Sequence, residues 1–139
     1  MEQTIRDLMS KPALCIDASE SVADAARYMC ENDVGDILVT RDGKLCGIVT
    51  DRDIVVRCVA QGQDPSETRV DRICSEELTT LSPDDLVDDA VVRMRERAVR
   101  RIPVVEREHV VGIVSLGDLA RERDPASALG AISAATANR

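Results

Sequence analysis

The chain has 139 residues, the length of one ordinary domain, so each half of about 60 residues is too short to hold a large core alone. Its 44% hydrophobic and 32% charged residues are typical of a folded globular protein and argue against disorder. A net charge of −8 and a single aromatic residue, Tyr28, argue against nucleic acid as a partner, because phosphate backbones need clustered cations and single-stranded bases stack on aromatic rings.

Membrane and metal chemistry have little support in the sequence. No apolar run is long enough to cross a bilayer, and the first residues lack the apolar core of a secretory signal, so we expect a cytoplasmic protein without a membrane partner. His109 is the only histidine, and the five cysteines form no C-x-x-C pair. We therefore expect no metal site and no cofactor.

The first half of the chain predicts two helices that flank a pair of strands. Residues 4–10 form a short amphipathic helical turn, and residues 13–16 an extended segment. Ser19 or Asp17 caps the first long helix. The apolar positions of that helix have helical spacing and predict one buried face: Val22, Ala25, Ala26, Met29 and Cys30.

The spacing changes to that of a strand at residues 37–40, and Asp42-Gly43 predicts a tight hairpin turn to a strand at residues 45–49. A helix at residues 52–60 follows and ends at Gln61-Gly62. The polar stretch after it, which contains Gly and Pro, is the best linker candidate.

The second half repeats this order. Ser82-Pro83 predicts a helix start, with a Ser cap and Pro at the first helical position. Strands at residues 102–105 and 110–114 follow, and Pro103 predicts an edge strand because proline cannot donate to a ladder. Residues 126–139 are rich in Ala and Ser, and we expect a flexible tail.

The two halves match at one constant offset, which indicates an internal duplication. Gly47 and Gly112 are 65 residues apart (112 minus 47), and so are Asp53 and Asp118 (118 minus 53). Apolar positions match more often than surface positions, as two copies of one buried scaffold would. We assign residues 1–62 to the first repeat, 63–67 to a linker, 68–123 to the second repeat and 124–139 to the tail.

Each repeat contains a strand that runs from a glycine to a hydroxyl residue, with an aspartate three positions later. Thr50 and Asp53 form the first of these strand-to-helix corners, and Ser115 and Asp118 the second. The simplest interpretation is a capping box, which satisfies backbone N–H groups and needs no ligand. A second interpretation is nucleoside binding, because an aspartate can accept both hydroxyls of a ribose and a helix N-terminus favours phosphate. The two roles are compatible.

The duplicated layout and both corners resemble the CBS domain family, specifically a tandem CBS pair, or Bateman module. The resemblance covers residues 4 to about 123. It rests on the signature Gly-apolar-apolar-Thr/Ser-x-x-Asp at both corners, and on Arg101-Ile102-Pro103-Val104-Val105 as the family's middle strand. It implies an α+β fold of two repeats of β-α-β-β-α type, whose sheets pack together with pseudo-twofold symmetry and leave two clefts.

In the family these clefts bind adenosine-containing ligands: AMP, ADP, ATP or S-adenosylmethionine. The resemblance implies that the Thr/Ser and Asp contact ribose and phosphate. Carried over, one cleft combines Thr50, Arg52 and Asp53 with residues near Thr79, Val99 and Arg100. The other cleft combines Ser115 and Asp118 with residues near Ala13, Val34 and Gly35. Asp36 stands where the second repeat has Arg101, so the clefts are not equivalent, and the cleft with Thr50 and Arg100 should hold phosphate better.

These observations leave three functions to weigh. The first is a sensor that binds an adenosine-containing ligand, forms a homodimer through its helical faces and signals to an unknown protein partner in trans. The second is an interaction or dimerisation module with unoccupied clefts, in which the corners only cap helices. The third, an enzyme, lacks a recognisable nucleophile-base pair or metal set, so we expect no catalysis.

Overall fold

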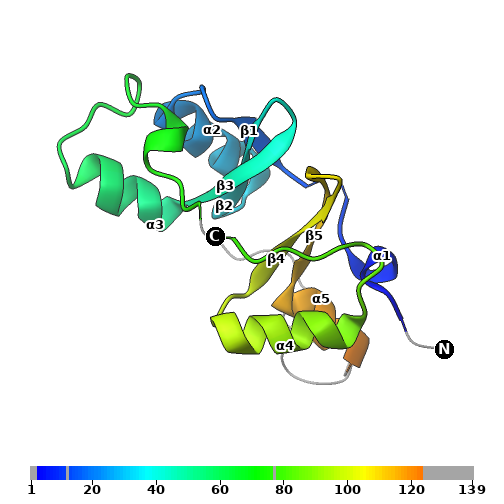
Figure 1. The fold of residues 1–139 in the computed structure, drawn as a ribbon. Coiled ribbons are helices and arrows are strands. Elements are labelled where there is room, and N and C mark those ends of the chain that lie inside the picture. The colour runs from blue at the N-terminus through cyan, green and yellow to red at the C-terminus, as the bar shows by residue number, and fades with distance from the viewer. Residues whose placement is uncertain (1–2, 12, 77, 124–139) are drawn as a thin grey trace. The chain divides into compact units, whose positions relative to one another are not determined.

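The computed structural model describes residues 3–11, 13–76 and 78–123, and shows a mixed α+β fold (Figure 1). It divides into two compact units. One unit runs from Leu14 to Leu78. The other combines the segment up to Ala13 with the segment from Thr79 onward. The predicted tail at residues 124–139 lies outside the described residues.

The 14–78 unit has three strands, with β1 beside β2 in parallel and β3 antiparallel to β2. Its elements are β1 (Cys15–Asp17), α2 (Val22–Asn32), β2 (Asp36–Arg41), β3 (Lys44–Thr50), α3 (Asp51–Asp53), the π-helical segment η1 (Ile54–Val59) and the 3₁₀ turn η2 (Val70–Arg72). The predicted hairpin turn is confirmed: Asp42 and Gly43 have φ angles of 55° and 80°, the left-handed backbone that a tight turn between these strands requires.

The other unit is built from α1 (Ile5–Leu8), α4 (Val87–Arg97), the antiparallel strands β4 (Arg101–Glu106) and β5 (His109–Ser115), and α5 (Leu116–Arg123). Helices α4 and α5 lie side by side, and α1 contacts both (Figure 1). Strand β4 pairs with β5 on one side and makes an isolated bridge with Leu81 on the other, which agrees with the edge position expected for Pro103.

The predicted starts of the two long helices are wrong. Ser21, not Ser19 or Asp17, caps α2, and Asp24 completes the capping box. Asp17 instead accepts hydrogen bonds from the amide and hydroxyl of Ser19, in a turn before the helix.

Helix α4 begins at Val87, one turn after the predicted start at Ser82. Residues 82–85 form a closed turn, in which the Ser82 amide donates to the Asp85 carboxylate at 2.8 Å. The carbonyls of Pro83 and Asp85 accept hydrogen bonds from the α1 backbone. Residues 82–85 therefore pair with α1 and do not start helix α4.

The predicted buried face of the first long helix is too wide, and the helix after β3 is also covered on a narrow stripe. On α2 only Val22, Ala25 and Met29 are buried, whereas Ala26 and Cys30 are exposed. On η1 only Cys58 is buried, and Val55 and Val59 each keep 57% of their surface exposed. A short helix on a three-stranded layer is covered on one narrow stripe, so the flanking apolar residues remain outside the core.

The two cores use matched positions of the repeats. Each pair at the offset of 65 has one member buried in each unit: Val22/Val87, Ala25/Ala90, Met29/Met94, Ile37/Ile102, Val39/Val104 and Val49/Val114. The duplication is therefore present in the packing of the two cores as well as in the sequence.

The repeats exchange their first segments between the units. Ile5 and Met9, from the start of the first repeat, are buried with the second repeat. Their matches Val70 and Cys74 are buried with the first repeat. The compact units therefore do not coincide with the sequence repeats.

Two glycines make these contacts possible. A Cβ on Gly47 would lie 2.9 Å from the Ser75 carbonyl oxygen, and one on Gly112 would lie 3.0 Å from that of Ser10. Ser75 and Ser10 form matched bridges to the strand residues Ile48 and Ile113. Only glycine allows the exchanged backbone to come this close.

Candidate functional site

The first corner lies where β3 ends and α3 begins. The Asp53 amide donates to the Thr50 hydroxyl at 3.1 Å, and the Thr50 amide donates to Asp53 Oδ2 at 2.9 Å. This is the capping box that the sequence predicted. Asp53 Oδ1 lies 3.8 Å from Arg57 Nε, as an ion pair, and accepts no hydrogen bond from the described residues.

The second corner repeats this geometry between β5 and α5. The Asp118 amide donates to the Ser115 hydroxyl at 3.1 Å, and the Ser115 amide donates to Asp118 Oδ2 at 2.9 Å. Here the other oxygen is occupied, because Arg121 Nη2 forms an ion pair and hydrogen bond with Asp118 Oδ1.

The two corners therefore differ in access. The Asp53 side chain keeps 14% of its surface exposed, and the Asp118 side chain 8%. Since Arg121 takes the second oxygen of Asp118, the first corner has the more available carboxylate. Sequence reasoning expected unequal clefts but missed both arginines. The signal was the spacing: Arg57 follows Asp53 by four residues and Arg121 follows Asp118 by three, and either spacing places the arginine on the same helix face as the aspartate.

Each corner is closed by the segment that precedes the middle strand of its own unit. The Asp51 amide donates to the Gly35 carbonyl at 2.9 Å, and the Leu116 amide donates to the Arg100 carbonyl at 2.7 Å. Gly35 thus lies beside the Thr50 corner, and Arg100 beside the Ser115 corner. The sequence grouped them the other way. Those crosswise groups join residues of both units and stay predictions.

The remaining predicted site residues divide between the units. Val34 closes the end of α2, where its amide donates to the Met29 carbonyl, and Arg52 is exposed on α3 beside Asp53. In the other unit, Ala13 and Thr79 are partly buried in extended segments.

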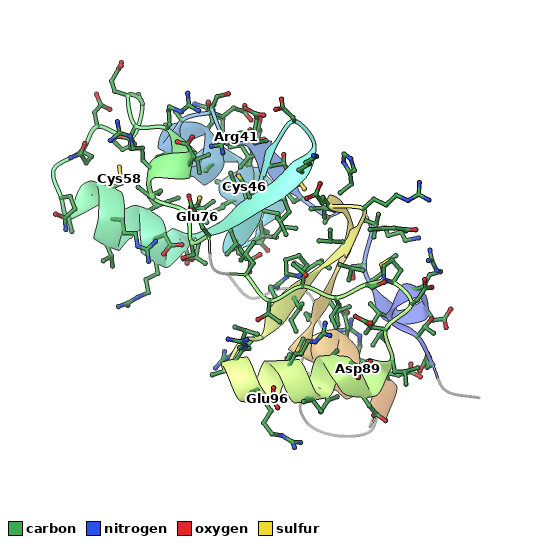
Figure 2. The ribbon with its side chains drawn as sticks, viewed as in Figure 1. Arg41, Cys46, Cys58, Glu76, Asp89 and Glu96 are labelled. Atoms are coloured by element: carbon green, nitrogen blue, oxygen red, sulfur yellow. The ribbon has the colours of Figure 1, made fainter. Side chains whose placement is uncertain are left out.

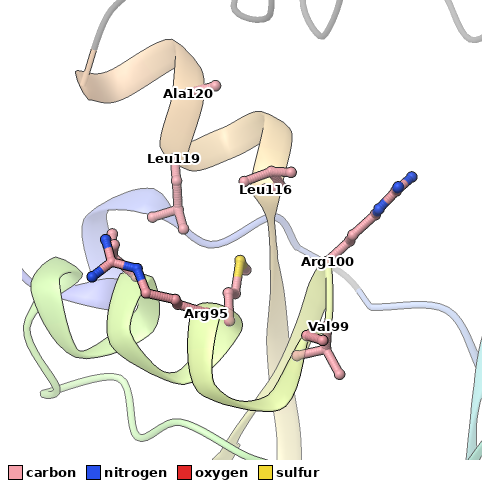
Figure 3. A pocket seen from close by; sticks show the side chains of 9 residues that line it. Arg95, Val99, Arg100, Leu116, Leu119 and Ala120 are labelled. Carbon is pink, nitrogen blue, oxygen red and sulfur yellow. The ribbon is translucent and has the colours of Figure 1, made fainter.

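An apolar pocket of about 500 Å³ lies between α4 and α5 (Figure 3). Val99 and Leu116 stand at its mouth, where α4 leads into β4 and α5 begins, and Leu119 points toward α4 (Figure 3). Arg100 extends its charged end away from the apolar walls, whereas the Arg95 side chain runs along α4 (Figure 3). Val99 and Arg100 were predicted to contact a ligand, so the structure places two predicted site residues at an apolar surface.

The cysteines are spread over the 14–78 unit (Figure 2). Burial raises the pKa of the Cys15, Cys46 and Cys74 thiols, so these side chains are neutral and poorly nucleophilic at neutral pH. Within the described residues, no three His, Cys, Asp or Glu side chains are grouped to hold a metal ion.

No helix in the described part of the chain is both long and apolar enough to cross a membrane.

The CBS domain family model matches the chain at residues 5–59 and 70–124. The chain is 38% identical over 117 residues to the CBS domain-containing protein YhcV of Bacillus subtilis, which covers 84% of this chain and 83% of the relative. The structure of the present chain is similar to that of Hypoxic Response Protein I with two coordinated zinc ions, with a TM-score of 0.79 and 33% identity. The match covers 86% of this chain and 98% of that one.

A third similarity concerns a ligand complex. The CBS domain pair of protein MJ0100, solved with 5'-methylthioadenosine and S-adenosyl-L-methionine, has a TM-score of 0.75 and 27% identity, and covers 88% of this chain and 96% of that one. Each matched stretch contains one capped corner, and both corners have the same capping hydrogen bonds. The chain therefore belongs to the CBS domain family and carries two CBS domains in tandem.

Proposed function

We propose that this protein is a regulatory sensor that binds an adenosine-containing ligand, such as AMP, ADP, ATP or S-adenosylmethionine, at its strand-to-helix corners. The observation that carries the proposal is the split use of the Asp53 carboxylate. Oδ2 caps the helix, whereas Oδ1 accepts no hydrogen bond from the described residues and is available to a ribose hydroxyl. The adenosine ligands in the similar CBS pair of MJ0100 support the same chemistry.

The ligand occupies the Thr50 corner first. At the Ser115 corner a ribose hydroxyl must displace Arg121 from Asp118 Oδ1, which costs a charge-assisted hydrogen bond. The difference between the corners makes the protein respond to the ligand in two steps. A partner protein reads the state that the ligand stabilises, and this requires a ligand with different affinities for the two states.

Thermal unfolding with AMP, ATP and S-adenosylmethionine tests the binding. At a ligand concentration 100 times the dissociation constant, the free energy of unfolding should rise by about 2.7 kcal/mol. Asp53→Ala should abolish this rise, and should also lower the stability of the free protein by about 1 kcal/mol through loss of the cap.

Asp24→Ala is the matched control, because Asp24 completes the capping box of α2 outside the proposed site. It should lower stability by a similar amount and leave the ligand response intact. If none of the three ligands stabilises the wild-type protein, the corners serve as caps alone and the sensor proposal fails.

The exposed valines of η1 favour self-association as a second function. Val55, Val56 and Val59 keep 57%, 42% and 57% of their surface exposed, which is unusual for a helix of a soluble monomer. We infer that they pack against a second copy of the chain in a homodimer. Light scattering should give the mass of a dimer for the wild type and for Ser66→Lys, which adds a charge in an exposed loop, and the mass of a monomer for Val55→Lys combined with Val59→Lys. A monomeric wild type would contradict the dimer.

A further inference from the structure

A second pocket, of about 420 Å³, lies in the 14–78 unit between the end of η1 and the segment at residues 61–73. Its walls are polar, in contrast to those of the pocket between α4 and α5. They consist of guanidinium, amide, hydroxyl and carboxylate groups with one apolar side chain: Arg57, Arg69, Arg72, Gln61, Gln63, Thr68, Glu67 and Ile73. Five of these residues, 61, 63, 67, 68 and 69, lie between the two stretches that match the CBS family model.

The three arginines of this pocket differ in their hydrogen-bond and ion-pair partners. Arg57 Nη1 donates to the Ile73 carbonyl at 3.0 Å. Arg69 pairs with Asp71 at 2.9 Å. Across residues 3–11, 13–76 and 78–123, nothing pairs with the Arg72 guanidinium, which is exposed.

The charge of the walls favours an anion. The lining contains three arginines and one glutamate, Glu67, so before the ion pairs with neighbouring carboxylates are counted its side chains carry a formal charge of +2 (three minus one), in a chain whose net charge is −8. Asp53 forms an ion pair with Arg57, and Asp71 neutralises Arg69, which leaves Arg72 as the cation with no carboxylate partner in the described part of the chain. A guanidinium holds phosphate by paired hydrogen bonds, and the pocket is larger than one phosphate group.

We propose that this pocket is a second ligand site, which shares Arg57 with the Thr50 corner but uses neither the Thr50 nor the Ser115 capping box, and that it takes a small phosphorylated sugar or polyol. Arg72 holds the phosphate. The side chains of Gln61 and Gln63 offer amide groups for the hydroxyls of the carrier, and the Thr68 hydroxyl, which donates to the Asp64 carbonyl, can accept a hydrogen bond from them. Apolar or aromatic carriers do not fit these walls, because they would bury the polar groups of the walls without forming hydrogen bonds to them.

Amide chemical-shift titration of the full chain tests the site. Inorganic phosphate and glucose 6-phosphate are the probes, and glucose at the same ionic strength is the uncharged comparison. The phosphorylated probe should give saturable shifts at the amides of Gln63, Thr68 and Arg72, and glucose should give none. Arg72→Gln should weaken the binding about tenfold or more, as loss of a charge-assisted hydrogen bond does.

Arg27→Gln is the matched control, because it removes an exposed arginine of the same unit that lies on α2 outside the pocket. It should leave the binding unchanged. Arg57 is not a suitable variant, since its bond to the Ile73 carbonyl also supports the fold. If Arg72→Gln perturbs the fold, the exposed Gln63 provides Gln63→Ala, which should weaken binding by a smaller factor.

The proposal is overturned if neither phosphate nor glucose 6-phosphate gives saturable shifts at these amides. It is also overturned if glucose gives the same shifts, or if Arg72→Gln and Arg27→Gln weaken the response equally. The sensor proposal stands or falls separately, because AMP binding at the Thr50 corner does not involve Arg72.

Discussion

Asp53 and Asp118 occupy matched positions of the two repeats, and a single side chain makes them different. Both aspartates use Oδ2 to cap a helix. The other oxygen of Asp118 is taken by Arg121, whereas that of Asp53 only lies 3.8 Å from Arg57. The sequence predicted both caps correctly from the Thr/Ser-x-x-Asp spacing. It could not predict the difference, because the rotamer of a long arginine depends on its surroundings and not on spacing alone.

Arg121→Gln should convert the second corner into one that resembles the first. The free energy of unfolding should fall by about 1–3 kcal/mol, because Asp118 is buried and loses a charged hydrogen-bond partner. The affinity of that corner for AMP should rise, since the ribose no longer competes with a guanidinium. Calorimetric titration of the variant and the wild type measures both binding steps. Unchanged affinity at every step would show that Arg121 does not obstruct the corner.

The repeat predicts the relative positions of helices and strands better than the capping motifs predict where the helices start. Helices α2 and α4 start 65 residues apart (87 minus 22), and strands β2 and β4 do the same (101 minus 36). The motif at Ser82 misplaced the start of α4 because its turn is paired with α1, a contact between segments far apart in sequence. The exposure of Val55 and Val59 was also missed, since apolar spacing does not show how much of a helix is covered.

Gly47→Ala should destabilise the protein more than Gly112→Ala. A Cβ at residue 47 would lie 2.7 Å from Cys74 Sγ and 2.9 Å from a backbone oxygen, neither of which can move easily. At residue 112 the nearest atom, at 2.7 Å, is the sulfur of the flexible Met9 side chain, and the Ser10 carbonyl oxygen lies slightly farther away than its counterpart, at 3.0 Å. Urea unfolding should give a loss of about 1–3 kcal/mol for Gly47→Ala, as overpacking does. Equal stability of the wild type and both variants would rule out close packing of the exchanged segments.

The ion pairs of Asp71 should make stability depend on pH. This residue of η2 pairs with Arg69 and with Arg41 of β2, and the hydrogen bond from Arg69, followed by the charge of both arginines, holds the pKa of its carboxyl below the usual value. A lowered pKa in the folded state stabilises the protein above the unfolded value of about 3.9, and this contribution is lost as the pH falls through the folded pKa.

Asp71→Asn should therefore lower the free energy of unfolding at pH 7 by about 1 kcal/mol or less, and the difference should shrink below about pH 4. Glu96→Gln, at an exposed position of α4 (Figure 2), is the control and should change little at either pH. A difference for Asp71→Asn that stays constant from pH 7 to pH 3 would argue against the ion pairs as its cause.

For the whole molecule, the duplication predicted two copies of one scaffold, and the resemblance to the CBS domain family, carried by the signature at both corners, implied an α+β fold with two CBS domains. They did not predict that each compact unit takes its first segment from the other repeat. Matched positions such as Ile5 and Val70 have the same apolar character, so either unit could have accepted either segment. The polar pocket at Arg72 was missed for a related reason: its residues are ordinary surface side chains in the sequence, and only the fold brings them together.

The central claim is that a nucleoside ligand binds at the Thr50 corner before the Ser115 corner. Amide chemical-shift mapping of the full chain with increasing AMP or S-adenosylmethionine tests it most directly. We predict that the amides of Thr50 and Asp53 shift at low ligand concentration, and those of Ser115 and Asp118 only at higher concentration. Shifts that saturate elsewhere while both corners remain unchanged would contradict the claim.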